Sequence, residues 1–135
     1  MSLRPALLVL AVSAFSGCVT PFRAPPNVAY IRLDLVDSPV VRVEKVWLER
    51  ENGLLVVRGY VIKRLGATDT SQTHLDVTLF DAEGRVLRRT VAHFEPRQIP
   101  RRHRWISSAS YNVPLDPLPA GTTHIEVRAH EGSHS

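Results

Sequence analysis

The sequence predicts an all-β domain, a sandwich of two antiparallel sheets with about seven strands. Short segments rich in β-branched residues alternate between apolar and polar side chains, which is typical of half-buried strands. Turn residues separate these segments at intervals of roughly 8 to 12 residues. No helical periodicity longer than about two turns competes with the strand pattern.

Composition restricts the class of protein further. The chain has 135 residues, 44% of them hydrophobic and 22% charged, and a formal net charge of +4. These values exclude a disordered tail, a multi-domain protein and a multi-pass membrane protein. Cys18 is the single cysteine, so an intramolecular disulfide and a zinc site built on two cysteines are excluded.

The N-terminus has the pattern of an export signal. Arg4 precedes an apolar run at residues 6–15, and two small residues lead to Cys18. Ten helical residues extend about 15 Å, half of the hydrocarbon core of a bilayer, so the run is too short for a stable transmembrane helix. We expect residues 1–17 to be a helical signal peptide that is removed.

The segment Phe15-Ser16-Gly17-Cys18 resembles the lipobox of bacterial lipoproteins, with Phe15 where leucine is commonest. The resemblance implies that the Cys18 sulfur receives a diacylglyceryl group, that cleavage occurs just before Cys18, and that the new amine is acylated. Three acyl chains would anchor the protein essentially permanently, because each buried methylene contributes about 0.8 kcal/mol. By the sorting rule of enterobacterial lipoproteins, Val19 in place of aspartate favours the outer membrane, with the domain facing the periplasm.

After the lipidated cysteine, residues 18–27 contain three prolines and are expected to form a semi-rigid tether. The folded domain is expected at residues 28–135, long enough to bury a core without disulfides. The alternation of side chains predicts its strands at residues 30–36, 40–50, 54–63, 74–80, 85–94, 105–113 and 123–129.

Each predicted strand has its own local support. Residues 30–36 alternate and are expected to lie at a sheet edge, and the apolar phase of residues 40–50 slips by one, which predicts a β-bulge or burial on both faces. Asn52-Gly53 predicts a type I′ hairpin turn into the next strand, where Gly59 marks a bulge or a close neighbour. Residues 74–80 have the cleanest pattern of a half-buried strand.

Loops and turns separate the remaining strands. Residues 65–72 and 95–104 are polar or charged and are expected to be loops, and residues 81–84 form a turn. Residues 114–121 contain three prolines, which lack ladder donors and cannot join a central strand. Seven strands with this spacing predict a sandwich of the immunoglobulin-like type.

Two segments resemble the FxLYD-type immunoglobulin-like modules of exported bacterial proteins. They are residues 58–61, RGYV, and residues 75–87, LDVTLFDAEGRVL. In those modules, a strand ending in leucine, an aromatic residue and aspartate meets a turn and a DxxGxVL return. The resemblance covers about half of the mature chain and implies a fold more than a function.

Catalytic and cofactor patterns do not emerge from the sequence. It contains no G-x-S-x-G nucleophile elbow and no glycine-rich loop that opens onto a helix. The carboxylate pairs Glu49/Glu51 and Asp81/Glu83 lie beside turns and are interpreted as solvated charges. We therefore expect no enzymatic activity and no cofactor.

Six histidines prompt a metal hypothesis. On the last predicted strand, His124, Glu126, Arg128 and His130 share one face. His124 and Glu126 could bind a metal, but Arg128 lies between the potential ligands and would repel a cation. Ordinary surface histidines, with no metal, are the favoured interpretation.

The basic loop at residues 97–104 is the sharper candidate site. It carries Arg97, Arg101, Arg102 and Arg104 and is followed by Trp105. Arginine binds phosphate and carboxylate groups through two parallel hydrogen bonds, so the loop could contact phospholipid headgroups, lipopolysaccharide phosphates or an acidic partner. The favoured interpretation, however, is that these arginines only blunt an exposed sheet edge and keep the protein soluble.

Aromatic residues offer a weaker candidate. Trp47, Trp105 and Tyr111 could form a ligand platform, but each lies in a predicted strand with apolar neighbours. We therefore expect them in the core of the sandwich.

Together these features predict a lipid-anchored, periplasm-facing binding or accessory module of a cell-envelope assembly, without catalytic activity. A protein partner would contact the strand edges or the basic loop, and export disfavours nucleic acid. The alternative function is a binding module for an anionic envelope ligand, a lipid or lipopolysaccharide phosphate, that uses the basic loop.

Overall fold

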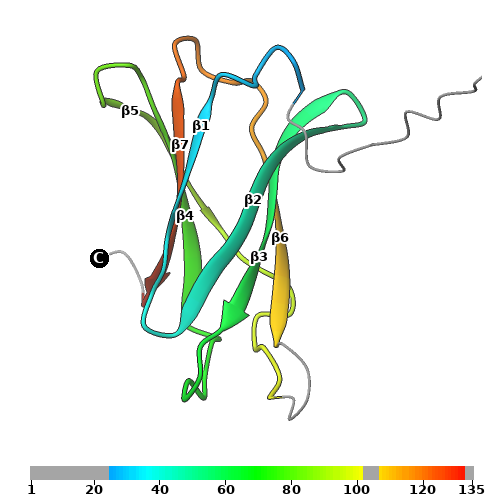
Figure 1. Cartoon of the computed structure of the whole chain (residues 1–135), viewed down its shortest axis with the longest axis vertical. Coiled ribbons are helices and arrows are strands. Elements are labelled where there is room, and N and C mark those ends of the chain that lie inside the picture. The colour runs from blue at the N-terminus through cyan, green and yellow to red at the C-terminus, as the bar shows by residue number, and fades with distance from the viewer. Residues whose placement is uncertain (1–24, 102–106, 133–135) are drawn as a thin grey trace, which may run out of the picture.

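The computed structural model describes residues 25–101 and 107–132, which form a β-sandwich of seven strands (Figure 1). One sheet has the order β1-β7-β4-β5 and the other the order β2-β3-β6. The four-stranded sheet consists of β1 (Arg32–Val36), β7 (His124–Glu131), β4 (Thr73–Phe80) and β5 (Val86–Ala92). The three-stranded sheet consists of β2 (Val41–Glu51), β3 (Leu54–Lys63) and β6 (Ser108–Pro114).

The predicted strand pattern is confirmed in its order, and the ends of the strands shift by at most three residues. The hairpin between β2 and β3 turns at Asn52 and Gly53, whose φ angles of 52° and 80° are those that a type I′ turn requires. Pro114 ends β6 opposite Val56. It is tolerated there because β6 is an edge strand. No helix in the described residues is long and apolar enough to cross a membrane.

The phase slip in the second predicted strand is a β-bulge. The register of β2 against β3 shifts between Val43 and Lys45, so Val43 and Val46 both face the core although they are an odd number of positions apart. An extra residue on one strand reverses the faces that follow it. The bulge therefore decides which side chains of β2 point outward beyond Lys45.

The pairing of β1 differs from the antiparallel arrangement that we predict. β1 lies at a sheet edge as expected, but it runs parallel to β7, with Arg32 opposite His124 and Val36 opposite Arg128. The two strands lie at opposite ends of the domain sequence, so no turn between them sets their direction. The Nε2 atom of His124 lies 2.5 Å from a carboxylate oxygen of Asp34 across this pair.

The fourth strand is more buried than its alternation predicts. Its outward side chains His74, Asp76 and Thr78 are only 6%, 6% and 3% exposed. β4 lies between β7 and β5, so neighbours on both sides cover its polar face. The prediction of a half-buried strand is therefore wrong for β4.

The core lies between the sheets and is mainly aliphatic. Its largest fully buried side chains include Phe94, Leu48, Leu55, Leu75, Leu79, Ile99, Leu115 and Ile125. They come from both sheets and from the loops that cross between them. This packing makes both sheets firm platforms for the side chains on their outer faces.

The turn at residues 81–84 makes the stability of the domain sensitive to acid. Asp81 accepts hydrogen bonds from the backbone N–H groups of Arg85 and Glu83, at 2.9 and 3.0 Å, and lies 2.8 Å from Nε of Arg85. The Arg85 backbone bond, with these other contacts, lowers the pKa of Asp81 below its ordinary value of 3.8. Glu51 and Asp69 have lowered pKa values as well, through side-chain hydrogen bonds from Asn112 and Ser71 respectively.

We therefore expect the free energy of unfolding to fall as the pH drops below about 4. The unfolded chain binds protons more readily at these carboxylates, so their contribution is complete above the unfolded pKa and is lost through the folded one. Urea unfolding at several pH values should show a weaker acid dependence for Asp81→Asn than for the wild type. An equal slope for the two proteins would contradict this assignment.

Candidate functional site

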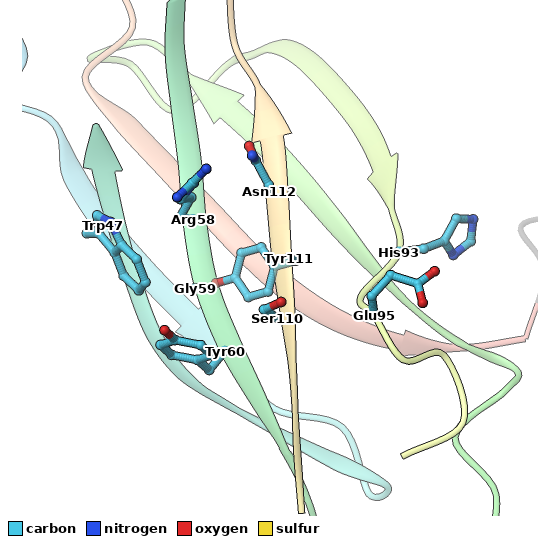
Figure 2. Close-up of a pocket in the computed structure, with 9 residues that line it drawn as sticks. All are labelled: Trp47, Arg58, Gly59, Tyr60, His93, Glu95, Ser110, Tyr111 and Asn112. Atoms are coloured by element: carbon cyan, nitrogen blue, oxygen red, sulfur yellow. The ribbon is translucent and has the colours of Figure 1, made fainter. Parts of the chain in front are cut away.

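A hollow of ≈ 520 Å³ lies on the three-stranded sheet and the segment that borders β6 (Figure 2). Trp47 comes from β2, Arg58 and Tyr60 from β3, and Ser110 and Asn112 from β6. His93 and Glu95 border the opposite end from Trp47 (Figure 2). We call this feature the aromatic hollow.

The segment that follows β5 is fixed against β6 by two backbone hydrogen bonds. The Glu95 N–H donates to the Ser110 carbonyl at 2.8 Å, and the Ser110 N–H donates to the Glu95 carbonyl at 2.9 Å. This isolated bridge extends the three-stranded sheet by one short pairing. It brings the Glu95 carboxylate to the hollow although β5 belongs to the other sheet.

Arg58 is held by two carboxylates of the neighbouring strand. Its guanidinium lies 3.0 Å from Glu49 and 2.6 Å from Glu51. Asn112 donates to the same Glu51 oxygen at 3.1 Å, and the Asn112 and Arg58 contacts lower the pKa of Glu51. All three charged side chains are about one-third to two-fifths exposed, so their main effect is on geometry rather than on stability.

This network also orients the indole of Trp47. Its Nε1–H donates to Glu49 at 2.9 Å, and its ring centroid lies 5.6 Å from that of Tyr60, with the planes tilted by 47°. Tyr60 is 42% exposed and Trp47 is half-buried. The two rings thus present a partly exposed apolar surface beside a set of carboxylates.

The prediction that Trp47 belongs to the core is therefore wrong, whereas it is confirmed for Tyr111. The bulge at Val43/Lys45 places Trp47 beyond the phase slip and turns it to the outer face of β2. Tyr111 is 3% exposed and packs in the core, and burial raises its pKa. Trp105 lies outside the described residues.

Gly59 lets the Tyr111 ring cross beneath the hollow. The Tyr111 hydroxyl donates to the Lys45 carbonyl at the bulge, at 3.0 Å, and Gly59 is directly opposite Tyr111 in the register. A Cβ atom on Gly59 would lie 2.0 Å from the Lys45 carbonyl oxygen and 2.2 Å from the Tyr111 hydroxyl. The sequence signal of a close neighbour at Gly59 is thus confirmed.

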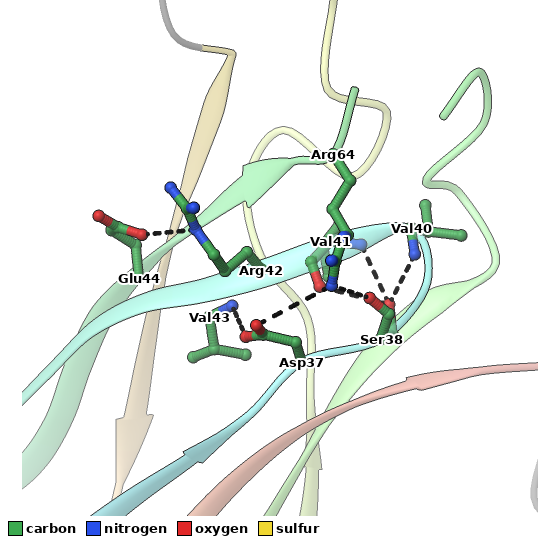
Figure 3. A network of polar contacts seen from close by, with 8 residues as sticks. All are labelled: Asp37, Ser38, Val40, Val41, Arg42, Val43, Glu44 and Arg64. Carbon is green, nitrogen blue, oxygen red and sulfur yellow. Dashed lines mark hydrogen bonds and ion pairs between the residues drawn. The ribbon is translucent and has the colours of Figure 1, made fainter. Parts of the chain in front are cut away.

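A polar corner fixes the start of β2 (Figure 3). The Ser38 hydroxyl accepts from the backbone N–H groups of Val40 and Val41 at 3.1 and 3.0 Å. Asp37 accepts from the Val43 N–H at 2.9 Å, and Arg64 donates to the Ser38 carbonyl at 3.2 Å. The corner joins the two sheets just before the bulge and so fixes the strand that carries Trp47.

The structure describes only residues 97–101 of the basic loop. The Arg97 guanidinium donates to the Ser71 carbonyl at 3.1 Å, while Gln98 donates to the Thr68 carbonyl and accepts from the Thr70 N–H, both at 3.0 Å. Arg101 is exposed, and Arg102, Arg104 and Trp105 lie outside the described residues. In the described part of this loop, Arg97 therefore stabilises the junction with residues 68–71.

One carboxylate pair and one histidine have different surroundings from those that the sequence predicts. Glu49 and Glu51 lie in β2 and bind Arg58, so they are not solvated turn charges. His74 is buried, which contradicts its assignment as an ordinary surface histidine. His124 contacts Asp34, and its ring stacks on Phe80 with centroids 5.0 Å apart.

Sequence reasoning missed the aromatic hollow because its residues come from four separate segments. The alternation of side chains after the bulge was the one signal that could have placed Trp47 beside Arg58 and Tyr60. Nothing local could have placed Glu95 there. Comparison with known proteins yields no match to a protein family, a curated protein or a solved structure.

Proposed function

We propose that this protein is a lipid-anchored, periplasm-facing binding module of a cell-envelope assembly, non-catalytic, and that the aromatic hollow contacts a protein partner. The lipobox-like segment ending at Cys18 and the proline-rich tether support the anchor. The four-plus-three division of the strands supports an immunoglobulin-like sandwich. In this proposal the domain stands off the outer membrane and presents the outer face of β2, β3 and β6.

The charges in and beside the aromatic hollow indicate which kind of partner it would bind. Among its lining residues, Arg58 is the one with a fixed positive charge, and Glu49 and Glu51 already neutralise it. Glu95 adds a further carboxylate, and Lys45 lies opposite Tyr60 on the same face of the sheet. Two fixed positive charges and three carboxylates thus border the hollow, with Glu95 at the opposite end from the two partly exposed aromatic rings.

This combination suits a cationic side chain on an extended or looped segment of a partner. Aromatic faces attract lysine and arginine, and a nearby carboxylate strengthens the contact. A phosphate would meet net negative charge there. The hollow therefore favours a basic segment of a protein over an anionic lipid.

The basic loop supports the anionic-ligand alternative less strongly. Arg97 already donates to the Ser71 carbonyl, and Arg88 of β5 donates to the carbonyls of Leu115 and Pro117. Both guanidinium groups are therefore engaged with backbone carbonyls of the domain. Arg101, Arg102 and Arg104 of the loop therefore serve as control positions in the crosslinking experiment.

A photocrosslinking side chain in place of Tyr60, in the full-length lipoprotein in its native cells, tests the proposal. We expect one protein to be captured, identified by mass spectrometry, and at least about tenfold less capture when Glu95→Lys is added. The same crosslinker in place of Leu87, an exposed residue of the opposite sheet, is the positional control. Arg101→Glu, Arg102→Glu and Arg104→Glu together should leave capture at position 60 unchanged.

Three results would contradict the proposal. Equal capture from positions 60 and 87 would mean that the hollow is not a specific contact surface. Capture that survives Glu95→Lys but is lost with the three arginine reversals would assign binding to the basic loop. Absence of acyl chains on Cys18, measured by mass spectrometry of the purified protein, would rule out the lipid anchor.

A further inference from the structure

A second cluster of polar side chains lies on the outer face of the four-stranded sheet. His74 and Asp76 of β4 and His130 of β7 place one ligand atom each within 4.8 Å of one another. His74 and Asp76 are each 6% exposed, and His130 is half-buried. The cluster belongs to the other sheet from the aromatic hollow, so it is independent of the proposed partner site.

The backbone brings these three residues together. His74 is directly opposite His130 in the antiparallel pairing of β4 with β7, and their ring centroids lie 5.0 Å apart. Asp76 is two residues beyond His74 and shares its face of the strand. Both strands are interior to the sheet, so neighbours on each side fix the positions of the Cβ atoms.

Asp76 supplies the one carboxylate of the cluster. A buried carboxylate is costly unless a positive charge or hydrogen bonds compensate it. The Nε2 atom of His74 lies 3.5 Å from a carboxylate oxygen of Asp76. Arg128 is opposite Asp76 in the register, and the Asp76 charge helps to raise the pKa of Arg128, after the larger effect of Glu126. Arg128 also donates from Nε to Glu126 at 2.9 Å, so it interacts with both carboxylates.

The donor set indicates the class of ion. Two imidazoles and one carboxylate suit zinc and the neighbouring divalent transition metals, whereas calcium and magnesium prefer oxygen ligands alone. Three protein ligands around zinc leave a fourth position for water. Ligand atoms about 2.1 Å from a tetrahedral zinc ion lie about 3.4 Å from one another. The three ligand atoms lie within 4.8 Å of one another, so side-chain rotations would have to bring them closer together around an ion.

We propose that His74, Asp76 and His130 form a binding site for a divalent transition-metal ion, with zinc as the reference ligand. The site differs from the His124/Glu126 pair that the sequence suggests. His124 contacts Asp34, and Glu126 bonds to Arg128. A bound ion would link the two central strands of the four-stranded sheet, and the folded state would gain stability with the ion concentration.

Calorimetric titration of the full-length protein in detergent with zinc chloride tests this site. We expect one ion per chain, with Asp76→Asn and His130→Gln each weakening binding by at least about 100-fold. His124→Gln is the matched control, since it removes a histidine from the same face of β7, and it should leave the affinity unchanged. A rise in Tm with zinc should accompany binding in the wild type and in His124→Gln.

A measurement on the wild type keeps the test independent of how the variants fold. Long-range proton–nitrogen spectra of the imidazoles should show zinc-dependent shifts at His74 and His130 and at no other histidine. Shifts confined to other histidines, an absence of saturable binding, or equal affinity in all variants would overturn the proposal. None of these outcomes depends on the partner experiment at Tyr60.

Discussion

Replacing Gly59 with alanine is expected to destabilise the domain by about 3 kcal/mol or more. The new Cβ atom would lie 2.0 Å from the Lys45 carbonyl oxygen and 2.2 Å from the Tyr111 hydroxyl. The first of these atoms belongs to the backbone of the β2 bulge, so rotating a side chain cannot relieve the clash. The bulge and the Tyr111 ring would have to move together.

Gly66→Ala is the matched control for this substitution. Gly66 has open space around its Cβ position but a φ of +87°, so alanine there meets only backbone strain of about 1 kcal/mol. Urea unfolding of the two variants separates the two effects. A Gly59→Ala variant no less stable than Gly66→Ala would show that the bulge yields easily. If Gly59→Ala does not fold while Gly66→Ala does, the destabilisation by the clash exceeds the stability of the domain, which also supports the prediction.

The same substitution should also disturb the aromatic hollow. Trp47 lies beyond the bulge, and its outward direction depends on the register that begins at Lys45. We therefore expect Gly59→Ala to shift the fluorescence of Trp47 at urea concentrations where the protein is still folded. Trp105 also emits, so the measurement is best made in a Trp105→Phe background.

Replacing Thr70 with valine is expected to cost about 3 kcal/mol, the second largest effect. The Thr70 hydroxyl donates to the Arg97 carbonyl at 2.7 Å and accepts from the Ile99 N–H at 2.8 Å, and Thr70 and Ile99 are both fully buried. Valine keeps the shape of threonine but leaves both backbone groups without this partner. Each unsatisfied buried group costs about 1 to 3 kcal/mol.

Thr70→Ser is the matched control, because serine keeps the hydroxyl and loses only a methyl group, at about 1 kcal/mol. Urea unfolding gives the free energies, and amide hydrogen exchange at Ile99 reports the local effect. Faster exchange at Ile99 in Thr70→Val, with near wild-type exchange in Thr70→Ser, would support the role of the hydroxyl. Equal losses in the two variants would assign the effect to packing.

The Thr70 contact explains why residues 97–101 are not a simple solvated loop. Ile99 fills the core, and the Lys63 ammonium donates to the carbonyls of Ile99 and Thr68, both at 3.1 Å. Ile99 lies between Gln98 and Pro100 in a polar, arginine-rich segment, and a single apolar residue in such a segment has no periodicity. Its burial depends on the loop that starts after β3, far away in the sequence.

The sequence by itself determined the elements. Period-two alternation and the Asn52-Gly53 turn predicted the strands and the hairpin, because each depends on residues close together in the chain. The phase slip after Val43 left a bulge or burial on both faces open, and the structure has the bulge. Tertiary structure alone decided how the elements combine. The parallel pairing of β1 with β7, the second buried face of β4 and the pairing of Glu95 with Ser110 at the border of the hollow all join distant segments.

The two proposed sites follow the same division. His74 and Asp76 are visible in sequence as one face of a strand, but His130 joins them only when β7 pairs with β4 in a particular register. Arg58 reaches Glu49 diagonally across the β2–β3 hairpin, past the bulge. A side-chain pattern determines the face of a strand, whereas contacts between strands depend on register and sheet order, which are set by the packing of the whole core.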